Sequence, residues 1–230
     1  MGAVDDKGRV RVGVMISGRG SNLQALLDAC ADPAFPAEIV LVISNRPEAD
    51  GLTRAREAGV ATQAIDHREF PDREAFDAEV TAAFEAAGAD LVCMAGFMRL
   101  VTEGFVAHWR DRLINIHPSL LPLFPGLDTH GRALAAGVKL HGCTVHFVRF
   151  DPDTGPIVGQ AAVPVLPGDT ADTLAARVLV AEHRLYPHCL RLVAEGRVSV
   201  RGDVAAVEDP NIGAAAPLIN PAPERPVSAT

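Results

Sequence analysis

Residues 113–126 read Leu-Ile-Asn-Ile-His-Pro-Ser-Leu-Leu-Pro-Leu-Phe-Pro-Gly, and they indicate both a buried strand and the place of its polar groups. The first five residues are apolar except for Asn115 and His117, which is typical of a strand inside a parallel sheet, and Pro118 ends it because proline has no backbone donor. Side chains alternate along a strand, so the amide and the imidazole point to the same face at its carboxyl end. Ligands bind at that edge of open α/β sheets, and we expect the chemistry there.

The loop after this strand favours a functional reading of His117. Taken alone, a histidine in an apolar strand is more often a core residue that bonds a nearby carbonyl. Prolines at positions 118, 122 and 125 stiffen the loop beyond what packing requires, and functional residues tend to lie on loops that are held in position.

Length and composition predict one sizeable α/β domain. The chain has 230 residues, of which 48% are hydrophobic and 22% charged, close to the average for a soluble globular protein. Apolar strands that alternate with helical patterns predict an open, doubly wound, mostly parallel sheet of Rossmann-like type, with an antiparallel extension near the C-terminus. We expect this domain over residues 1–202. Residues 203–230 lack periodicity and are expected to form a surface-wrapped or disordered tail.

Charge, termini and cysteines argue against several classes of function. A net charge of −8 opposes nucleic-acid binding, which needs a basic surface. No segment is apolar over the length of a membrane span, and the acidic residues near the N-terminus do not fit a secretory signal, so we expect a cytoplasmic protein. The four cysteines are far apart and the histidines lack ligand spacing, which predicts buried thiols and no metal.

A strand, a glycine-rich turn and a helix open the domain. Residues 10–16 are apolar and β-branched, residues 17–22 read Ser-Gly-Arg-Gly-Ser-Asn, and a helix is expected over 23–30. Glycines let the backbone approach an anion, and Ser21 or Asn22 at the helix cap would leave N–H groups pointing at it. The turn lacks the full glycine pattern of a dinucleotide site and the lysine of a P-loop, so a tight turn with a good cap is an equal alternative.

The remaining elements follow from periodicity and from glycine and proline breaks. We expect buried strands over residues 38–44, 61–65 and 91–94, a more exposed strand over 142–150, and strands over 157–165 and 198–200. We expect helices over residues 52–58, 73–87, 130–136 and about 169–195, the last one capped by Asp169 or Thr170. The strands at 142–150 and 157–165 are joined by a turn and form the antiparallel extension.

Four motifs together resemble a known family. They are Gly20-Ser21-Asn22, Ala95-Gly96-Phe97-Met98-Arg99, Asn115-Ile116-His117-Pro118-Ser119-Leu120-Leu121-Pro122 and Asp153-Thr154-Gly155-Pro156. In this order, over about residues 11–197, they resemble the phosphoribosylglycinamide formyltransferases. Those enzymes move a formyl group from 10-formyltetrahydrofolate to the amino group of glycinamide ribonucleotide in purine synthesis. The motif of residues 115–122 is shared with other formyltetrahydrofolate enzymes, so the Gly-Ser-Asn turn is the more specific signal.

The resemblance implies a role for each matched residue. The catalytic residues would be Asn115, His117 and Asp153. The ribonucleotide and its phosphate would be held by Gly20, Ser21, Asn22 and Glu182. The folate co-substrate would be contacted by Arg73, Met98, Arg99, Leu100, Val101 and Asn115. No metal is implied, and the oligomeric state is left open, with a homodimer as one alternative.

The chemistry of the three catalytic candidates agrees with formyl transfer. The amide of Asn115 and a protonated His117 would stabilise the negative charge that grows on the formyl oxygen. Asp153 would favour the imidazolium by its opposite charge, and a water held by Asp153 would relay protons from the attacking amine to the folate nitrogen. Leu123 and Asp128 depart from the family, whose members have basic or aromatic-nitrogen side chains there, so no further cationic help is expected from this loop.

Three other functions are alternatives to formylation of glycinamide ribonucleotide. A 10-formyltetrahydrofolate hydrolase would use the same residues with water in place of the amine, but such enzymes carry an additional N-terminal domain, for which there is no room before Arg11. Formylation of initiator methionyl-tRNA needs a basic RNA-binding surface, which the acidic charge opposes. A non-catalytic nucleotide-binding module would explain residues 20–22 but not the convergence of Asn115, His117 and Asp153.

Overall fold

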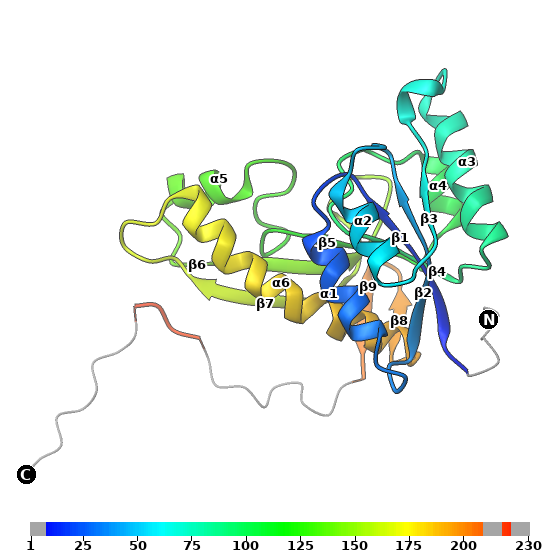
Figure 1. Cartoon of the computed structure of the whole chain (residues 1–230). Coiled ribbons are helices and arrows are strands. Elements are labelled where there is room, and N and C mark those ends of the chain that lie inside the picture. The colour runs from blue at the N-terminus through cyan, green and yellow to red at the C-terminus, as the bar shows by residue number, and fades with distance from the viewer. Residues whose placement is uncertain (1–7, 209–217, 222–230) are drawn as a thin grey trace, which may run out of the picture.

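A seven-stranded sheet forms the centre of the structure, a computed structural model that describes residues 8–208 and 218–221 (Figure 1). The strand order is β3-β2-β1-β4-β5-β6-β7, with bounds β1 Val10–Ile16, β2 Ala37–Ser44, β3 Thr62–Ala64, β4 Leu91–Met94, β5 Leu113–His117, β6 Leu140–Phe147 and β7 Ile157–Pro164. Strands β1 to β5 pair in parallel, while β6 and β7 extend the sheet antiparallel. The predicted fold class is confirmed. The strand order reverses between β1 and β4, so the loops after these strands flank the point where such sheets bind ligands.

Helices cover both faces of this sheet, and the sheet separates two hydrophobic cores. The helices are α1 Ser21–Cys30, α2 Asp50–Glu57, α3 Arg73–Ala86, α4 Glu103–His108, α5 Thr129–Ala135 and α6 Ala171–Ala194, with a 3-10 helix η1 at His67–Glu69. Buried residues of α1, α2 and α6 share one core with alternate residues of the sheet, and those of α3 and α4 share the other. Both faces are therefore covered, which explains the nearly continuous apolar sequences of β1, β2 and β4.

Tyr186 links α6 to the middle of the sheet. Its side chain is fully buried, and its hydroxyl oxygen lies 3.0 Å from the carbonyl oxygen of Met94 and 3.1 Å from that of Ile114. The single hydroxyl proton is shared between the carbonyls of two neighbouring strands, β4 and β5. Helix α6 therefore holds these two strands close to the points where their site loops begin.

Strand β6 is buried, so the expectation of a more exposed strand is wrong. All of its residues except Leu140 are buried. Helix α6 packs against β6, and the loop after β5 also reaches it. The Leu121 amide donates to Thr144 Oγ1 at 3.0 Å, and that hydroxyl donates to the Ser119 carbonyl at 2.7 Å. The polar side chains of Thr144 and His146, which suggested exposure, are thus paired inside the protein.

Several short elements differ from the expectation. Helices α4 and η1 were not predicted, because six and three residues are too few to display a helical period. Strand β8, Val198–Arg201, pairs antiparallel with β9, Val204–Val207, and the turn between them lies across the domain boundary expected after residue 202. The sequence of β9, Val-Ala-Ala-Val, is short and lacks alternation, which is why it was assigned to the tail.

Part of the expected tail is described and contacts the antiparallel end of the sheet. Asn220 Nδ2 donates to the carbonyl oxygen of Lys139 at 2.6 Å and to that of Val165 at 3.1 Å. Residues 209–217 and 222–230 of the expected tail lie outside the described residues. The division into a domain and a tail therefore stays a prediction.

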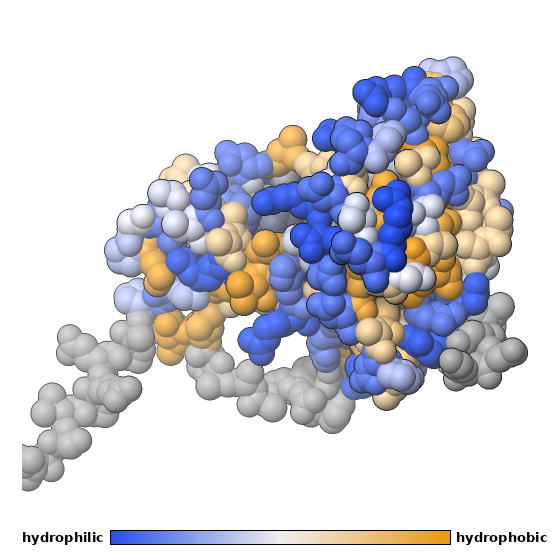
Figure 2. Space-filling view, in the orientation of Figure 1, coloured by the Kyte–Doolittle hydropathy of each residue, from blue (hydrophilic) through white to orange (hydrophobic). Residues whose placement is uncertain are grey.

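The surface does not present a continuous apolar band on the face that carries α1, α2 and α6. Figure 2 shows hydrophilic and hydrophobic side chains interspersed over these helices. Within the ranges that the structure describes, no helix is long and apolar enough to span a membrane.

Candidate active site

The carboxyl end of β5 holds two of the three candidates that the sequence singled out, and the third faces it. Asn115 and His117 lie on β5, and Asp153 lies in the turn between β6 and β7. The Nδ1 atom of His117 lies 3.3 Å from Oδ1 of Asp153, and the two side chains are 7% and 12% exposed. An imidazole and a carboxylate thus form a largely buried pair at the predicted edge of the sheet.

Both ring nitrogens of His117 face acceptors. Nδ1 faces the Asp153 carboxylate, and Nε2 lies 3.1 Å from the carbonyl oxygen of Phe124 in the Pro-rich loop. An imidazole donates from both nitrogens only when it is protonated. The geometry therefore suits the imidazolium, and the Phe124 carbonyl occupies the direction from which Nε2 would donate to a substrate.

Asp153 also ties its own turn to the Pro-rich loop. Its Oδ2 atom accepts a hydrogen bond from the Gly126 amide at 2.8 Å, while Oδ1 faces His117. The backbone φ of Asp153 is 60°, in the left-handed region that Asp and Asn tolerate better than most other non-glycine residues. The aspartate therefore meets a conformational requirement of the turn in addition to supplying charge.

His146 is a fourth polar residue of this site, which the sequence did not single out. Its Nδ1 lies 3.0 Å from the carbonyl oxygen of Phe147, and its Nε2 lies 3.3 Å from Asn115 Nδ2 and 3.9 Å from Asp153 Oδ1. Burial lowers the pKa of His146. In the neutral form with its proton on Nδ1, Nε2 accepts from the amide of Asn115 and fixes its orientation. The signal that could have found His146 is the antiparallel pairing that sets it opposite Asn115.

The glycine-rich turn after β1 has the geometry of an anion site, but not the predicted cap. Gly20 is the N-cap of α1 with φ 72°, and no described side chain caps this helix, so the expectation of a Ser21 or Asn22 cap is wrong. A Cβ atom at Gly20 would lie 2.7 Å from Cα of Gly51, at the start of α2. The close approach of the two backbones therefore requires a glycine here. The first-turn N–H groups of α1 are left without a side-chain acceptor.

Asn22 reaches α6 instead of capping its own helix. Its Nδ2 atom donates to Glu182 Oε2 at 2.7 Å, and both side chains are buried. Burial raises the pKa of Glu182, while the bond from Asn22 opposes this shift. The Oδ1 atom of Asn22 is buried without a hydrogen-bond partner among the described residues. Two residues that the sequence predicted for one site, from distant parts of the chain, are thus hydrogen-bonded to each other.

The loop after β4 presents apolar side chains around a fixed backbone. Met98 and Leu100 are 63% and 57% exposed, whereas Phe97 is buried and stacks on Phe76 of α3 with ring centroids 6.5 Å apart. The guanidinium of Arg99 lies over the same Phe76 ring, 5.5 Å from its centroid. The residues proposed for folate contact at 98–101 therefore lie in one loop, while Arg73 lies at the start of α3.

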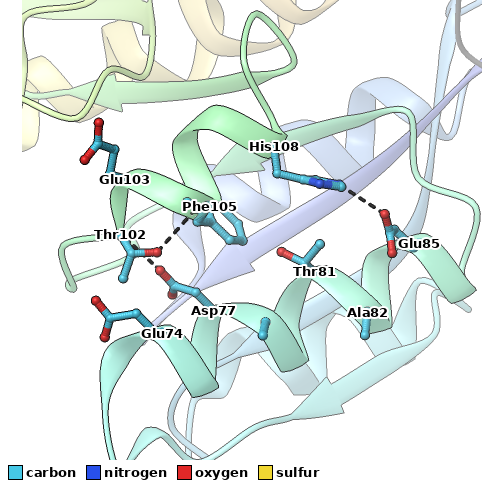
Figure 3. A pocket seen from close by; sticks show the side chains of 11 residues that line it. Glu74, Asp77, Thr81, Ala82, Glu85, Thr102, Glu103, Phe105 and His108 are labelled. Carbon is cyan, nitrogen blue, oxygen red and sulfur yellow. Dashed lines mark hydrogen bonds and ion pairs between the residues drawn. The ribbon is translucent and has the colours of Figure 1, made fainter.

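A groove between α3 and α4 lies beside Thr102, where the loop after β4 ends (Figure 3). Asp77 of α3 accepts from the Thr102 amide at 2.7 Å, and His108 of α4 lies 3.1 Å from Glu85. Burial raises the pKa of Asp77. The groove contains none of the catalytic candidates. Its contribution to the site is indirect, because Asp77 fixes the point where the loop after β4 enters α4.

The two departures from the resemblance lie at the surface of the Pro-rich loop. Leu123 is 56% exposed, and Asp128 is the N-cap of α5 with φ 50° and no capping bond from its side chain. Among the described residues, no group of three histidine, cysteine or acidic side chains could hold a metal ion.

An amide, an imidazole and a carboxylate at this edge of an open α/β sheet are typical of an enzyme active site, and comparison with known proteins identifies the family. The chain belongs to the formyl transferase family, which it matches over residues 10–190. It is 46% identical over 192 residues to the phosphoribosylglycinamide formyltransferase of Escherichia coli (strain K12), covering 84% of this chain and 91% of that protein. The crystal structure of glycinamide ribonucleotide transformylase 1 from Symbiobacterium toebii matches with a TM-score of 0.86 at 50% identity, covering 88% of this chain and 95% of that one.

Longer proteins contain a similar region. The chain is 51% identical over 200 residues to the trifunctional purine biosynthetic protein adenosine-3 of Drosophila melanogaster, covering 86% of this chain and 15% of that protein. It spans less than a fifth of the length of the trifunctional relatives it matches.

Proposed function

We propose that this protein transfers the formyl group of 10-formyltetrahydrofolate to the amino group of glycinamide ribonucleotide, giving formylglycinamide ribonucleotide and tetrahydrofolate in purine biosynthesis. The observation that carries the proposal is the contact of His117 with Asp153 beside an oriented Asn115, at the carboxyl end of β5. The names of the similar proteins support the same reaction. No metal takes part in it.

The ribonucleotide binds across α1 and α6. Its phosphate accepts hydrogen bonds from the N–H groups at the start of α1, after Gly20, where the helix dipole favours an anion. Ser21 lies in the first turn and adds its hydroxyl. The carboxylate of Glu182, which Asn22 orients through its Nδ2 atom, accepts bonds from hydroxyl or amino groups of the substrate. A substrate with a phosphate at one end and hydrogen-bond donors along its length fits the surface between the start of α1 and Glu182 of α6.

The formyl donor binds against the loop after β4. Met98, Leu100 and Val101 offer apolar contact, and the backbone of this loop offers donors and acceptors for a flat heterocycle. Arg99 and Arg73 supply positive charge for the acidic end of a folate. Asn115 lies on the neighbouring strand and contacts the formyl group.

The transfer uses two donors and one organising carboxylate. The substrate amine attacks the formyl carbon, a new C–N bond forms, and negative charge develops on the formyl oxygen. Asn115 and protonated His117 donate to this oxygen, for which Nε2 must exchange its bond to the Phe124 carbonyl for one to the substrate. The bond from the formyl carbon to the folate nitrogen then breaks. A proton from the amine reaches that nitrogen through a water held by Asp153.

The reaction takes place in the cytoplasm in this proposal. The four cysteines are free thiols, as expected in a reducing compartment. Sedimentation velocity at several protein concentrations distinguishes a monomer from a homodimer, the alternative named for the oligomeric state.

Product analysis tests the proposed function. The protein is mixed with 10-formyltetrahydrofolate, with and without glycinamide ribonucleotide, and tetrahydrofolate release is followed together with the mass of the ribonucleotide. We expect release only with the ribonucleotide, which gains one formyl group for each tetrahydrofolate. Equal release without it, with formate as the product, would instead establish a hydrolase. Binding of nucleotide with no turnover would establish a non-catalytic module.

A further inference from the structure

Ser17 is a buried hydroxyl that joins the two loops flanking the switch point of the sheet. It follows β1 directly and is 4% exposed. Its Oγ atom accepts a hydrogen bond from the Met98 amide at 2.8 Å and donates one to Oδ1 of Asn45 at 2.6 Å. A hydroxyl has a single proton, so the direction of each of these bonds is fixed by the other.

The partner of Ser17 is itself held in place. Asn45 follows β2 and is 1% exposed, and its carbonyl oxygen lies 2.9 Å from Nδ1 of His67 in η1. The chain of contacts therefore connects the segments that follow β4, β1, β2 and β3. Movement of the Met98 backbone away from Ser17 would leave the partly buried Met98 amide without its acceptor, which favours the observed position of the loop.

Ser17 also begins the turn that carries Gly20. The turn is fixed independently of Ser17, because the amide of Gly51 donates to the carbonyl oxygen of Gly18 at 3.0 Å and Arg54 Nε donates to that of Arg19 at 2.9 Å. Loss of the Ser17 hydroxyl should therefore release the loop after β4 and leave the turn in place.

We propose that Ser17 is a positioning residue for the formyl donor. Ser17 is the first residue of the turn that is proposed to bind the ribonucleotide, and its hydroxyl sets the backbone of Met98 against the pterin ring of the folate. This inference rests on the proposed function. Ser17 does not touch the reacting atoms. It holds the donor loop at a fixed distance from the ribonucleotide turn, so that the formyl carbon and the amine meet in register.

Steady-state kinetics of Ser17→Ala test this role. We expect the KM for 10-formyltetrahydrofolate to rise about tenfold, on the order of the loss of one hydrogen bond that positions the loop. The KM for glycinamide ribonucleotide should stay within about twofold, because the turn keeps its own contacts. Ser17→Cys retains the size of the side chain and a weak donor, and it should give an intermediate KM for the donor.

Ser44→Ala is the matched control. Ser44 is fully buried next to Asn45, but within the described part of the chain its hydroxyl bonds only the backbone of Arg46. This variant loses a buried hydroxyl of the same kind without touching the donor loop, so its KM for the formyl donor should not change. Thermal unfolding of all three variants separates a general loss of stability from the specific effect.

Direct binding separates this inference from the proposed function. Calorimetry with a non-reactive folate analogue should give a roughly tenfold weaker Kd for Ser17→Ala and an unchanged Kd for Ser44→Ala. Wild-type protein without turnover would refute the proposed function, while the calorimetry would still test Ser17. An unchanged donor KM and Kd in Ser17→Ala and Ser17→Cys, or an equal rise in Ser44→Ala, would overturn the positioning role.

Discussion

At the scale of single residues, Asp153 combines charge with a backbone conformation that few residues accept. Its carboxylate faces His117 through one oxygen and the Gly126 amide through the other, at a φ of 60°. Replacement by asparagine keeps the shape and tolerates the same φ, but it removes the negative charge that faces the His117 ring. Alanine would strain the backbone at this φ and remove the carboxylate at the same time, so asparagine is the informative substitution.

Asp153→Asn should fold and bind both substrates but transfer the formyl group slowly. General acid-base help is worth about 10²- to 10⁴-fold, so we expect the turnover number to fall by at least about 10²-fold. Asp151→Asn is the control, since Asp151 lies exposed in the same turn while Asp153 is the carboxylate that faces His117. Near-normal turnover in a folded Asp153→Asn variant would remove this carboxylate from the mechanism.

His141 is a residue whose titration should make the protein sensitive to acid. It is fully buried, 5.3 Å from the ring centroid of His130, and burial together with the neighbouring histidine lowers its pKa from 6.5 to about 4. Between these values the unfolded chain binds a proton that the folded chain does not. The free energy of unfolding should therefore decrease as the pH falls from about 6.5 to about 4, and the contribution is fully present above 6.5.

Urea unfolding at a series of pH values measures this effect. One such histidine contributes a slope of at most about 1.4 kcal/mol per pH unit, and His130 and His146, whose pKa values are also lowered by burial, add to it. His141→Gln should flatten the slope between pH 6.5 and 4. An unaltered slope in His141→Gln would show that acid acts on other groups.

The place where Asn115 and His117 lie was predictable from the sequence, whereas their assigned roles stay predictions. Asn115 and His117 stood out because polar side chains interrupt an apolar strand that ends in proline. His146 and Ser17 did not stand out. Their partners lie 31 and 81 residues away, and only the folded sheet brings them together. A buried histidine and a buried serine have no distinctive local pattern.

At the scale of elements, the turn between β1 and α1 depends on a close approach to α2. Gly20 has a φ of 72°, and an added Cβ would meet the backbone of Gly51 at 2.7 Å, whereas Gly18 has an ordinary φ and open space around it. The two glycines of one turn therefore differ in what they tolerate. This difference allows a test within a single element.

Gly20→Ala should lower the free energy of unfolding by more than about 1 kcal/mol, because both the backbone conformation and the contact with α2 are lost. Gly18→Ala should change it by less than about 0.5 kcal/mol. Chemical denaturation of the two variants beside the wild type gives both values. Equal effects of the two substitutions would contradict the close packing of this turn on α2.

The elements themselves were largely predictable, and the errors have physical causes. Strands β1, β4 and β5 were predicted with their observed bounds, because each is a short apolar run between clear breaks. The burial of β6 was missed, because its polar side chains are satisfied by a loop that is distant in the sequence. The helix cap at Ser21 or Asn22 was wrong, because Gly20 takes the cap position and Asn22 turns toward Glu182.

At the scale of the whole molecule, the sheet places the glycine-rich turn after β1, the loop after β4 and the His117–Asp153 pair at one edge. The glycine-rich turn follows β1, the loop containing Met98 follows β4, and His117 ends β5. These three strands are consecutive neighbours in the sheet. The hydroxyl of Tyr186 in α6 lies within hydrogen-bond distance of carbonyl oxygens of β4 and β5. Glu182, one turn earlier in the same helix, accepts a hydrogen bond from Asn22. One helix therefore supports both halves of the site.

Transfer of an isotopic label from donor to acceptor tests the central claim most directly. Wild-type protein is mixed with 10-formyltetrahydrofolate carrying ¹³C in the formyl group and with glycinamide ribonucleotide carrying ¹⁵N in its amino group, and the reaction is followed by NMR. We expect a one-bond coupling between ¹³C and ¹⁵N to appear in the product, and to appear far more slowly with Asp153→Asn. Recovery of the ¹³C label as free formate, with no carbon–nitrogen coupling, would contradict the account.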